Sequence, residues 1–267
     1  MPYGASFYLT RRARTLRTAE AMLPWVLDFV PANRLVDVGC GLGDWLAAAK
    51  ELGVREVHGL DGPWVPEDRL LIGRESFTQA DFREPLPALG QFDLAICLEV
   101  AEHLPAELAE PFVRNLCGLA PAVAFSAAIP GQGGLHHINE QWPSYWVELF
   151  RRAGFEEVDV LRPRMWEDER IPYWYRQNTI LFVSKEAGEL RSRLGEARSD
   201  GDFHGADLVH PEHAMRALQY PGVTDLVRAL PYAVARSFAA AGSESPEMKD
   251  GAGNNGETAS GDGSRKD

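Results

Sequence analysis

The sequence has few cysteines, a shortage of positive charge and no long hydrophobic run. Its 267 residues include three cysteines, Cys40, Cys97 and Cys117, which show no paired spacing. We therefore predict buried, unpaired thiols in the reducing environment of the cytoplasm. No apolar run approaches the length of a membrane span, and residues 1–22 lack the continuous apolar core of a secretory signal.

The charge balance restricts the partners of the protein. There are 27 Lys and Arg residues against 39 Asp and Glu residues, which gives a formal net charge of −12. Nucleic acid binding needs a basic surface, and so does binding to an anionic membrane. The composition therefore favours a small-molecule ligand over a nucleic acid or a membrane, and it leaves the oligomeric state open.

Short apolar runs alternate with helical segments along most of the chain. Strands are expected at residues 34–40, 55–61, 75–82, 91–99, 122–129, 156–162 and 179–185. The run at 91–99 is apolar on both faces, which is typical of a central strand in a parallel sheet. The alternation predicts an α/β fold in which helices cover both faces of a mostly parallel sheet.

The chain divides into four predicted parts. Residues 1–33 are expected to form an N-terminal helical cap or lid, with Tyr3 and Tyr8 near the site and a kink or division at Pro24. Residues 34–185 form the main domain, and residues 186–242 form a C-terminal helical extension. Residues 243–267 are predicted to be disordered, because from 244 onward they lack aromatic and β-branched aliphatic side chains.

A glycine-rich turn follows the first predicted strand. Asp37, Gly39, Gly41 and Gly43 lie between this strand and the next helix, where glycine allows a ligand to approach the backbone closely. The dinucleotide-binding fingerprint requires glycine at position 44, which is Asp44 here, so the pattern disfavours NAD.

The pattern Asp-x-Gly-x-Gly-x-Gly resembles the first motif of class I S-adenosylmethionine-dependent methyltransferases. The resemblance covers roughly residues 34–183 and implies a Rossmann-like sheet of seven strands in the order 3-2-1-4-5-7-6, with S-adenosylmethionine as the cofactor. In this family Asp61 would bind both ribose hydroxyls, Asp81 would bind the adenine amino group, and Phe82 would lie against the adenine ring. Asp61 and Asp81 could instead be ordinary turn or loop residues. The full set of implied cofactor-binding residues is Asp37, Gly39, Gly41, Gly43, Asp61, Gly62, Asp81, Phe82 and Glu99.

The segment "CLEVAEHLP" (97–105) places two acids and a histidine after the central strand. In a helical turn Glu99, Glu102 and His103 would share one face. The motif resembles those of ubiquinone-pathway O-methyltransferases and small-RNA 2′-O-methyltransferases. The latter bind a divalent metal through both glutamates, this histidine and a later histidine, which His137 would match. The resemblance thus implies that Glu99, Glu102, His103 and His137 hold Mg, Mn, Fe or Zn.

Two other interpretations of this segment remain open. Glu102 and His103 could only brace the sheet edge, or a histidine could act as a general base without a metal. Whether a metal or a general base acts here, the catalytic candidates are Glu102, His103 and His137.

Two later segments carry candidate acceptor-binding side chains, namely His136, Asn139, Gln141, Trp166, Tyr175 and Arg176. They could bind a polar acceptor, or they could form helix caps and a wrap over the sheet. We predict methyl transfer to oxygen of a small polar acceptor, sugar-like or a natural product, with possible assistance by a metal. The alternatives are cyclisation or another alkyl transfer from the sulfonium, and a non-catalytic binding protein that keeps the cofactor fold.

Overall fold

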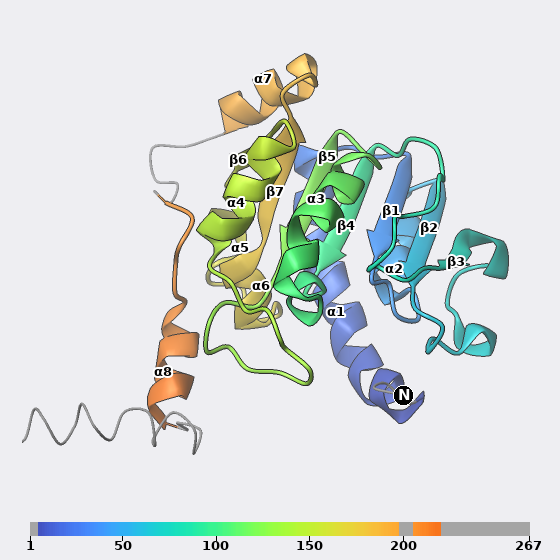
Figure 1. The fold of residues 1–267 in the computed structure, drawn as a ribbon, viewed down its shortest axis with the longest axis horizontal. Coiled ribbons are helices and arrows are strands. Elements are labelled where there is room, and N and C mark those ends of the chain that lie inside the picture. Colours follow the sequence, from blue (N-terminus) through green and yellow to red (C-terminus); the bar gives the residue numbers. More distant parts are fainter. Residues whose placement is uncertain (1–4, 198–204, 220–267) are drawn as a thin grey trace, which may run out of the picture. The chain divides into compact units, whose positions relative to one another are not determined.

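The predicted strands form one seven-stranded sheet in the order β3-β2-β1-β4-β5-β7-β6 (Figure 1), which confirms the predicted order. The structure is a computed structural model and describes residues 5–197 and 205–219. The strands are β1 (Arg34–Val38), β2 (Glu56–Asp61), β3 (Phe77–Gln79), β4 (Leu94–Leu98), β5 (Ala122–Ser126), β6 (Phe155–Val158) and β7 (Ile180–Ser184). Strands β1 to β5 pair in parallel, and β7 is antiparallel to both β5 and β6.

Helices cover both faces of this sheet, and Figure 1 shows α3 and α4 in front of the strands. The helices are α1 (Ala5–Phe29), α2 (Asp44–Glu51), α3 (Ala109–Cys117), α4 (Pro143–Arg152), α5 (Arg162–Met165), α6 (Tyr173–Asn178), α7 (Gly188–Ala197) and α8 (Pro211–Gln219). Short 3-10 turns are η1 (Glu67–Arg69), η2 (Arg74–Ser76), η3 (Ala101–His103) and η4 (Ala106–Leu108). Among the described residues, none of these helices combines the length and the apolar character that a membrane crossing requires.

The continuous apolar runs of the strands supply two cores, one on each face of the sheet. Successive side chains of a strand point to opposite faces. Leu35 of β1 and Ile96 of β4 therefore pack with α1 and α2, while Val36 and Cys97 pack with α3 and α4. All four side chains are fully buried, as expected for strands covered on both sides.

The predicted division of the leading helix at Pro24 is wrong, because α1 continues through this residue. Proline removes one backbone hydrogen bond from a helix. Met22, Leu23 and Val26 are buried on this helix, and their burial offsets that loss. Tyr3, the side chain of Tyr8 and residues 243–267 lie outside what the structure describes.

One expectation for residues 156–183 needs correction. The strand predicted at 156–162 ends at Val158, because Asp159 and Arg162 form a buried ion pair at 2.6 Å and Arg162 begins α5. The segment that joins the last two strands contains α6, whose Tyr173 and Arg176 are buried.

Candidate active site

The glycine-rich turn forms as predicted at the carboxyl end of β1. Gly39, Gly41 and Gly43 have φ values of 90°, 56° and 86°, which favour glycine because other residues are strained there. A Cβ atom on Gly39 would lie 2.3 Å from Cγ2 of Val100, in the turn after β4. The turn therefore packs against the turn after β4 at a distance that only glycine permits.

Asp61 ends β2 beside this turn, and its carboxylate accepts three hydrogen bonds from the protein. Its Oδ2 accepts a hydrogen bond from the Gly41 amide at 2.7 Å. Its Oδ1 accepts bonds from the Gly62 amide at 2.6 Å and from Trp64 Nε1 at 2.9 Å. Burial raises the pKa of Asp61, and these three bonds lower it in part. Asp61 thus joins the glycine turn to β2, and Trp64 is a partner that the sequence did not reveal.

Asp37 lies on β1 between these groups, paired with Ile96 of β4, and is 3% exposed. Its Oδ2 has no hydrogen-bond partner among the described residues. Burial raises its pKa well above the ordinary value, and the nearby charges of Asp61 and Asp44 raise it further. A buried acid in this state is stabilised by a proton or by a cationic ligand.

The segment after β3 runs beside Asp61, but its side chains point to other partners. The Ala80 amide donates to the Asp61 carbonyl at 2.8 Å. Asp81 is exposed and bonded to Arg83, which lowers its pKa. The Phe82 ring lies 5.8 Å from the ring of Phe112 on α3. The adenine-binding roles of Asp81 and Phe82 therefore stay predictions.

Three of the predicted metal-binding residues come together at the carboxyl ends of β4 and β5. Glu102, His103 and His137 offer ligand atoms that all lie within 4.8 Å of one another. Nε2 of His137 lies 3.8 Å from Oε1 of Glu102. The two imidazole rings are nearly perpendicular, with centroids 4.9 Å apart. We call Glu102, His103 and His137 the acid–histidine cluster.

Hydrogen bonds define which nitrogen of each imidazole carries the proton in the neutral ring. Nδ1 of His103 lies 3.1 Å from the His136 carbonyl oxygen, which can only accept. Nδ1 of His137 lies 3.0 Å from Oε1 of Glu140, and the Gly131 and Gly133 amides donate to that carboxylate at 2.8 Å. Both rings therefore carry the proton on Nδ1 and keep the lone pair on Nε2. This is how a second carboxylate or carbonyl commonly orients a metal-binding histidine.

Glu102 has an unusual environment for a carboxylate. It is 0% exposed, and neither oxygen has a hydrogen-bond partner among the described residues. Burial raises its pKa well above the ordinary value, and the charge of Glu99 raises it further. The backbone amides of Glu102 and Ala128 come near enough to lower the pKa in part, yet neither forms a hydrogen bond to the carboxylate. Such a group needs a proton or a cation.

Glu99 differs from the predicted four-ligand set, because its carboxylate is bound to two amide side chains. Its Oε1 accepts from Asn178 Nδ2 at 3.2 Å, and its Oε2 accepts from Gln132 Nε2 at 2.6 Å. Glu99 also has a left-handed φ of 58°. Burial raises its pKa to about 7, although the amide bonds lower it. The structure therefore places Glu99 beside the acid–histidine cluster and not among the three residues that compose it.

Two of the predicted acceptor-binding residues lie beside Glu102. The Asn139 amide donates to the Glu102 carbonyl at 3.0 Å, and Asn139 Oδ1 accepts from Gln141 Nε2 at 3.0 Å. Asn139 is 3% exposed, and its Nδ2 has no hydrogen-bond partner in the described part of the chain. His136 is exposed on the same loop.

The other three predicted acceptor-binding residues lie elsewhere. The Trp166 ring packs against His210 at 4.6 Å, and the Arg176 guanidinium donates to the Trp166 carbonyl at 2.8 Å. The Tyr175 ring lies edge-on to Trp45 of α2 at 5.6 Å. The structure thus divides the predicted set, and Tyr175 packs against the helix that follows the glycine turn.

Comparisons with known proteins agree with this geometry. A family model described as a methyltransferase domain matches residues 8–116. The ubiquinone biosynthesis O-methyltransferase of Xanthomonas axonopodis pv. citri (strain 306) is 31% identical over 176 residues, which cover 53% of this chain and 72% of that enzyme. The chain belongs to the class I S-adenosylmethionine-dependent methyltransferases. The predicted enzyme class and the predicted cofactor are confirmed.

Other similarities of this methyltransferase are more limited in extent. The ubiquinone biosynthesis O-methyltransferase of Xanthomonas campestris pv. campestris (strain B100) is 37% identical over 103 residues, which span 34% of this chain and 43% of that enzyme. An O-methyltransferase family protein from Burkholderia thailandensis is 13% identical, with a TM-score of 0.49 over 67% of this chain and 59% of that chain.

Methyl transfer from a sulfonium is an in-line displacement in which the cofactor supplies the leaving group. The methyltransferase must therefore align the acceptor and remove a proton where the acceptor is a hydroxyl. The glycine turn and Asp61 lie at the carboxyl ends of β1 and β2, and the acid–histidine cluster follows β4 and β5. Because β1 and β4 are neighbours in the sheet, these two parts of the site adjoin each other.

Proposed function

We propose that this methyltransferase transfers a methyl group to an oxygen atom of a small polar acceptor, with a divalent cation held by the acid–histidine cluster. The observation that carries this proposal is the buried Glu102 carboxylate, which lacks a hydrogen-bond partner in the described structure and faces His137 Nε2. The relatives named ubiquinone biosynthesis O-methyltransferase support oxygen as the methylated atom. The net charge of −12 supports a small molecule over a nucleic acid.

In this proposal the acids of the site bind the cationic cofactor. Asp61 accepts the ribose hydroxyls, and the glycine turn lets the cofactor lie against the backbone. Asp37 and Glu99 face the positive end of the cofactor, where the sulfonium and the ammonium group are found. Because methyl transfer removes the sulfonium charge, the same acids bind the demethylated product less strongly, which favours its release.

The residues of the cluster fit a divalent cation. Two imidazole nitrogens and one carboxylate are donors that Mn²⁺, Fe²⁺ and Zn²⁺ accept, and Mg²⁺ accepts the carboxylate. When bound, the cation would lower the pKa of an acceptor hydroxyl. Glu140 holds the His137 ring in the required orientation. The backbone amide of Asn139 donates to the Glu102 carbonyl and so holds the loop against Glu102. Without a cation, His137 is the group placed to accept the hydroxyl proton directly.

The acceptor is proposed to bind beside Asn139 and Gln141. Asn139 offers a buried Nδ2 donor without a partner in the described structure, which suits a hydroxyl or carbonyl oxygen of the acceptor. This supports a polyhydroxylated acceptor, sugar-like or a natural product. We also propose a cytoplasmic location, which the three free cysteines support.

Titration calorimetry with MnCl2, MgCl2 and ZnCl2 tests the metal site. We expect at least one of these ions to bind the wild type, and Glu102→Gln to weaken that binding at least tenfold because a charged ligand is lost. His136→Asn is the matched control, since His136 neighbours His137 but lies outside the cluster, and it should leave the affinity unchanged. Absence of binding by all three ions contradicts metal assistance.

Product analysis tests the reaction. The protein is incubated with methyl-labelled S-adenosylmethionine and a panel of catechols, phenols and polyols. S-adenosylhomocysteine and a labelled methyl ether are the expected products. Methylthioadenosine would instead support alkyl transfer from the sulfonium, and tight cofactor binding without turnover of any acceptor would support a non-catalytic binding protein.

A further inference from the structure

Three carboxamide side chains connect Glu99 to the C-terminal part of the described chain. We call residues 205–216 the C-terminal arm. The backbone amide of His210 in this arm donates to Gln177 Oε1 at 2.8 Å. Gln177 Nε2 donates to Asn178 Oδ1 at 2.8 Å, and Asn178 Nδ2 donates to Glu99 Oε1 at 3.2 Å. A continuous chain of hydrogen bonds thus runs from the arm to the carboxylate.

A second branch holds the other oxygen of Glu99. Asn178 Nδ2 also donates to Gln132 Oε1 at 2.8 Å, and Gln132 Nε2 donates to Glu99 Oε2 at 2.6 Å. Both carboxylate oxygens are therefore fixed, and Asn178 takes part in both branches. We call Gln132, Gln177 and Asn178 the amide relay.

The two ends of the relay fix the orientation of every amide between them. The His210 backbone N–H can only donate, and an ionised Glu99 carboxylate can only accept. Each amide therefore turns its oxygen toward the arm and its NH2 group toward Glu99. A single reversed amide would place two donors or two acceptors against each other, which costs free energy in a buried site.

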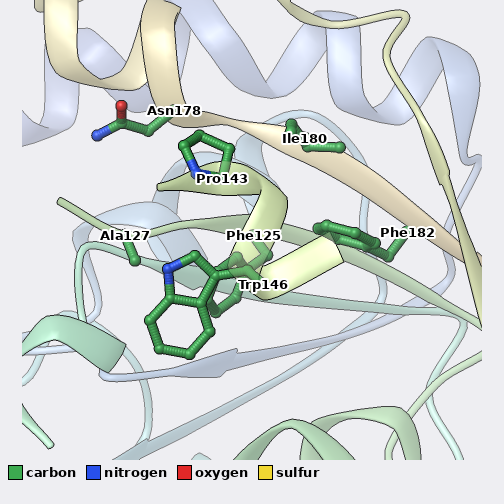
Figure 2. A pocket seen from close by; sticks show the side chains of 7 residues that line it. All are labelled: Phe125, Ala127, Pro143, Trp146, Asn178, Ile180 and Phe182. Atoms are coloured by element: carbon green, nitrogen blue, oxygen red, sulfur yellow. The ribbon is translucent and has the colours of Figure 1, made fainter. Parts of the chain in front are cut away.

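The two amides between the arm and Glu99 are buried, whereas Gln132 is half-buried, so water cannot freely replace bonds lost at Gln177 and Asn178. Gln177 and Asn178 are 0% and 3% exposed. Asn178 also lines a cavity of about 10 Å³. Figure 2 shows it with Phe125, Trp146 and the other, mostly apolar, lining side chains. That volume is room for about one water molecule.

The arm is docked by contacts other than the relay. Arg162 donates to the Gly205 and Ala206 carbonyls at 3.1 and 2.7 Å. Arg176 pairs with Glu212 at 2.8 Å. These contacts lie on both sides of His210 in the chain, so the donor at the start of the relay is held in place by α5 and α6.

We propose that the amide relay positions the Glu99 carboxylate for the cofactor, and that the docked C-terminal arm holds the relay. Asn178 is then a positioning residue that acts through Glu99, and the arm is a structural part of the cofactor site. This inference rests on the proposed role of Glu99 in cofactor binding.

A double-mutant cycle in the full chain tests the relay, with S-adenosylhomocysteine affinity measured by calorimetry. Glu99→Gln and Asn178→Leu should each weaken binding about tenfold, as expected for a lost or misdirected charged hydrogen bond. In the Glu99→Gln background, Asn178→Leu should change the affinity by less than about twofold, because its effect passes through Glu99. Gln177→Leu, which removes the hydrogen bond to the arm, should weaken S-adenosylhomocysteine binding less than Asn178→Leu does. Its effect should likewise disappear in the Glu99→Gln background.

Thr179→Val is the matched control, because Thr179 follows Asn178, is fully buried, and its Oγ1 has no hydrogen-bond partner among the described residues. It should leave the affinity within about twofold of the wild type. Asn178→Ala also removes the donor and introduces no charge, so it replaces Asn178→Leu if that variant does not fold.

Three outcomes overturn the inference, and they show which part of it fails. Equal losses from Asn178→Leu in both backgrounds, or no loss in either, refute the relay while the role of Glu99 stands. An unchanged affinity in Glu99→Gln refutes the proposed cofactor role of Glu99, and the inference fails with it.

Discussion

The two halves of the site differ in how many hydrogen bonds they donate to a buried carboxylate. Asp61, beside the glycine turn, is 7% exposed and accepts three hydrogen bonds from its surroundings. Glu102, in the acid–histidine cluster, is 0% exposed and has none from the described residues. The degree of burial therefore does not determine how many hydrogen bonds each carboxylate accepts.

The difference shows which half is complete without a ligand. The bonds of Asp61 hold the glycine turn in shape, so this half is stabilised by the protein itself. The carboxylate of Glu102 opposes folding unless it binds a proton or a cation, and a costly group of this kind is typical of functional sites. Substitutions on the two sides should therefore change stability in opposite directions.

The largest expected effect comes from exchanging these two acids for uncharged residues. Asp61→Ala leaves three donors without an acceptor and should lower the free energy of unfolding by about 2–4 kcal/mol. Glu102→Met replaces an unpaired acid with an apolar side chain and should raise it by about 1–3 kcal/mol. Urea denaturation in EDTA measures both, and a destabilised Glu102→Met variant would contradict the contrast.

A second prediction separates backbone strain from packing in the glycine turn. Gly39 and Gly53 both have positive φ values, 90° and 98°, but only Gly39 has a neighbour, Val100, within 4 Å of an added Cβ. Gly53→Ala should cost about 1 kcal/mol of stability from strain alone. Gly39→Ala should cost about 2–4 kcal/mol, because Val100 must also move. Equal losses in thermal or urea unfolding would show that the Val100 contact relaxes without cost.

A third prediction concerns pH. Burial raises the pKa of Glu99 from 4.5 to about 7, so the folded protein binds more protons than the unfolded chain between these values. The contribution of Glu99 to stability is therefore present below about pH 4.5 and is lost as the pH rises to about 7. Urea denaturation in EDTA should show lower stability at pH 7.5 than at pH 5, with a smaller difference in Glu99→Gln. A stability that rises over this range would refute the burial effect.

The smallest expected change in stability tests the place of His137. A Cβ on Gly134 would lie 2.1 Å from His137 Nε2, and the backbone of Gly134 does not have a positive φ. Gly134→Ala should therefore displace the imidazole and lower the affinity of the proposed site for a divalent cation about tenfold, while the free energy of unfolding stays within about 1 kcal/mol of the wild type. Gly188→Ala, with nothing within 4 Å of its Cβ, is the control. Titration of both variants with MnCl2 by calorimetry compares their affinities, and an unchanged affinity in Gly134→Ala would contradict the proposed place of His137.

The fold was predictable because its signals are local. The apolar run before Glu99 indicated the central strand, and Gly39 to Gly43 indicated the turn after the first strand. Strand ends and α6 were less predictable. The end of β6 depends on the ion pair between Asp159 and Arg162, and α6 depends on the packing of its aromatic segment. Neither interaction produces a periodic pattern in the sequence.

The candidate site was predictable in part for the same reason. Glu102 and His103 are adjacent in the sequence, and His137 follows the next strand. The partners of Glu99 were not predictable, because Gln132 and Asn178 lie 33 and 79 positions away in the sequence. Amides at such separations carry no pattern until the sheet brings them together.

The most direct test of the central claim is a crystal structure with S-adenosylhomocysteine and Mn²⁺, with the ion located from its anomalous signal. We expect the product in contact with Asp61 and the glycine turn, and one peak about 2–2.5 Å from a Glu102 oxygen and from Nε2 of both His103 and His137. Bound product with no peak at the acid–histidine cluster, and with the three side chains turned away from one another, would contradict a metal-assisted methyl transfer.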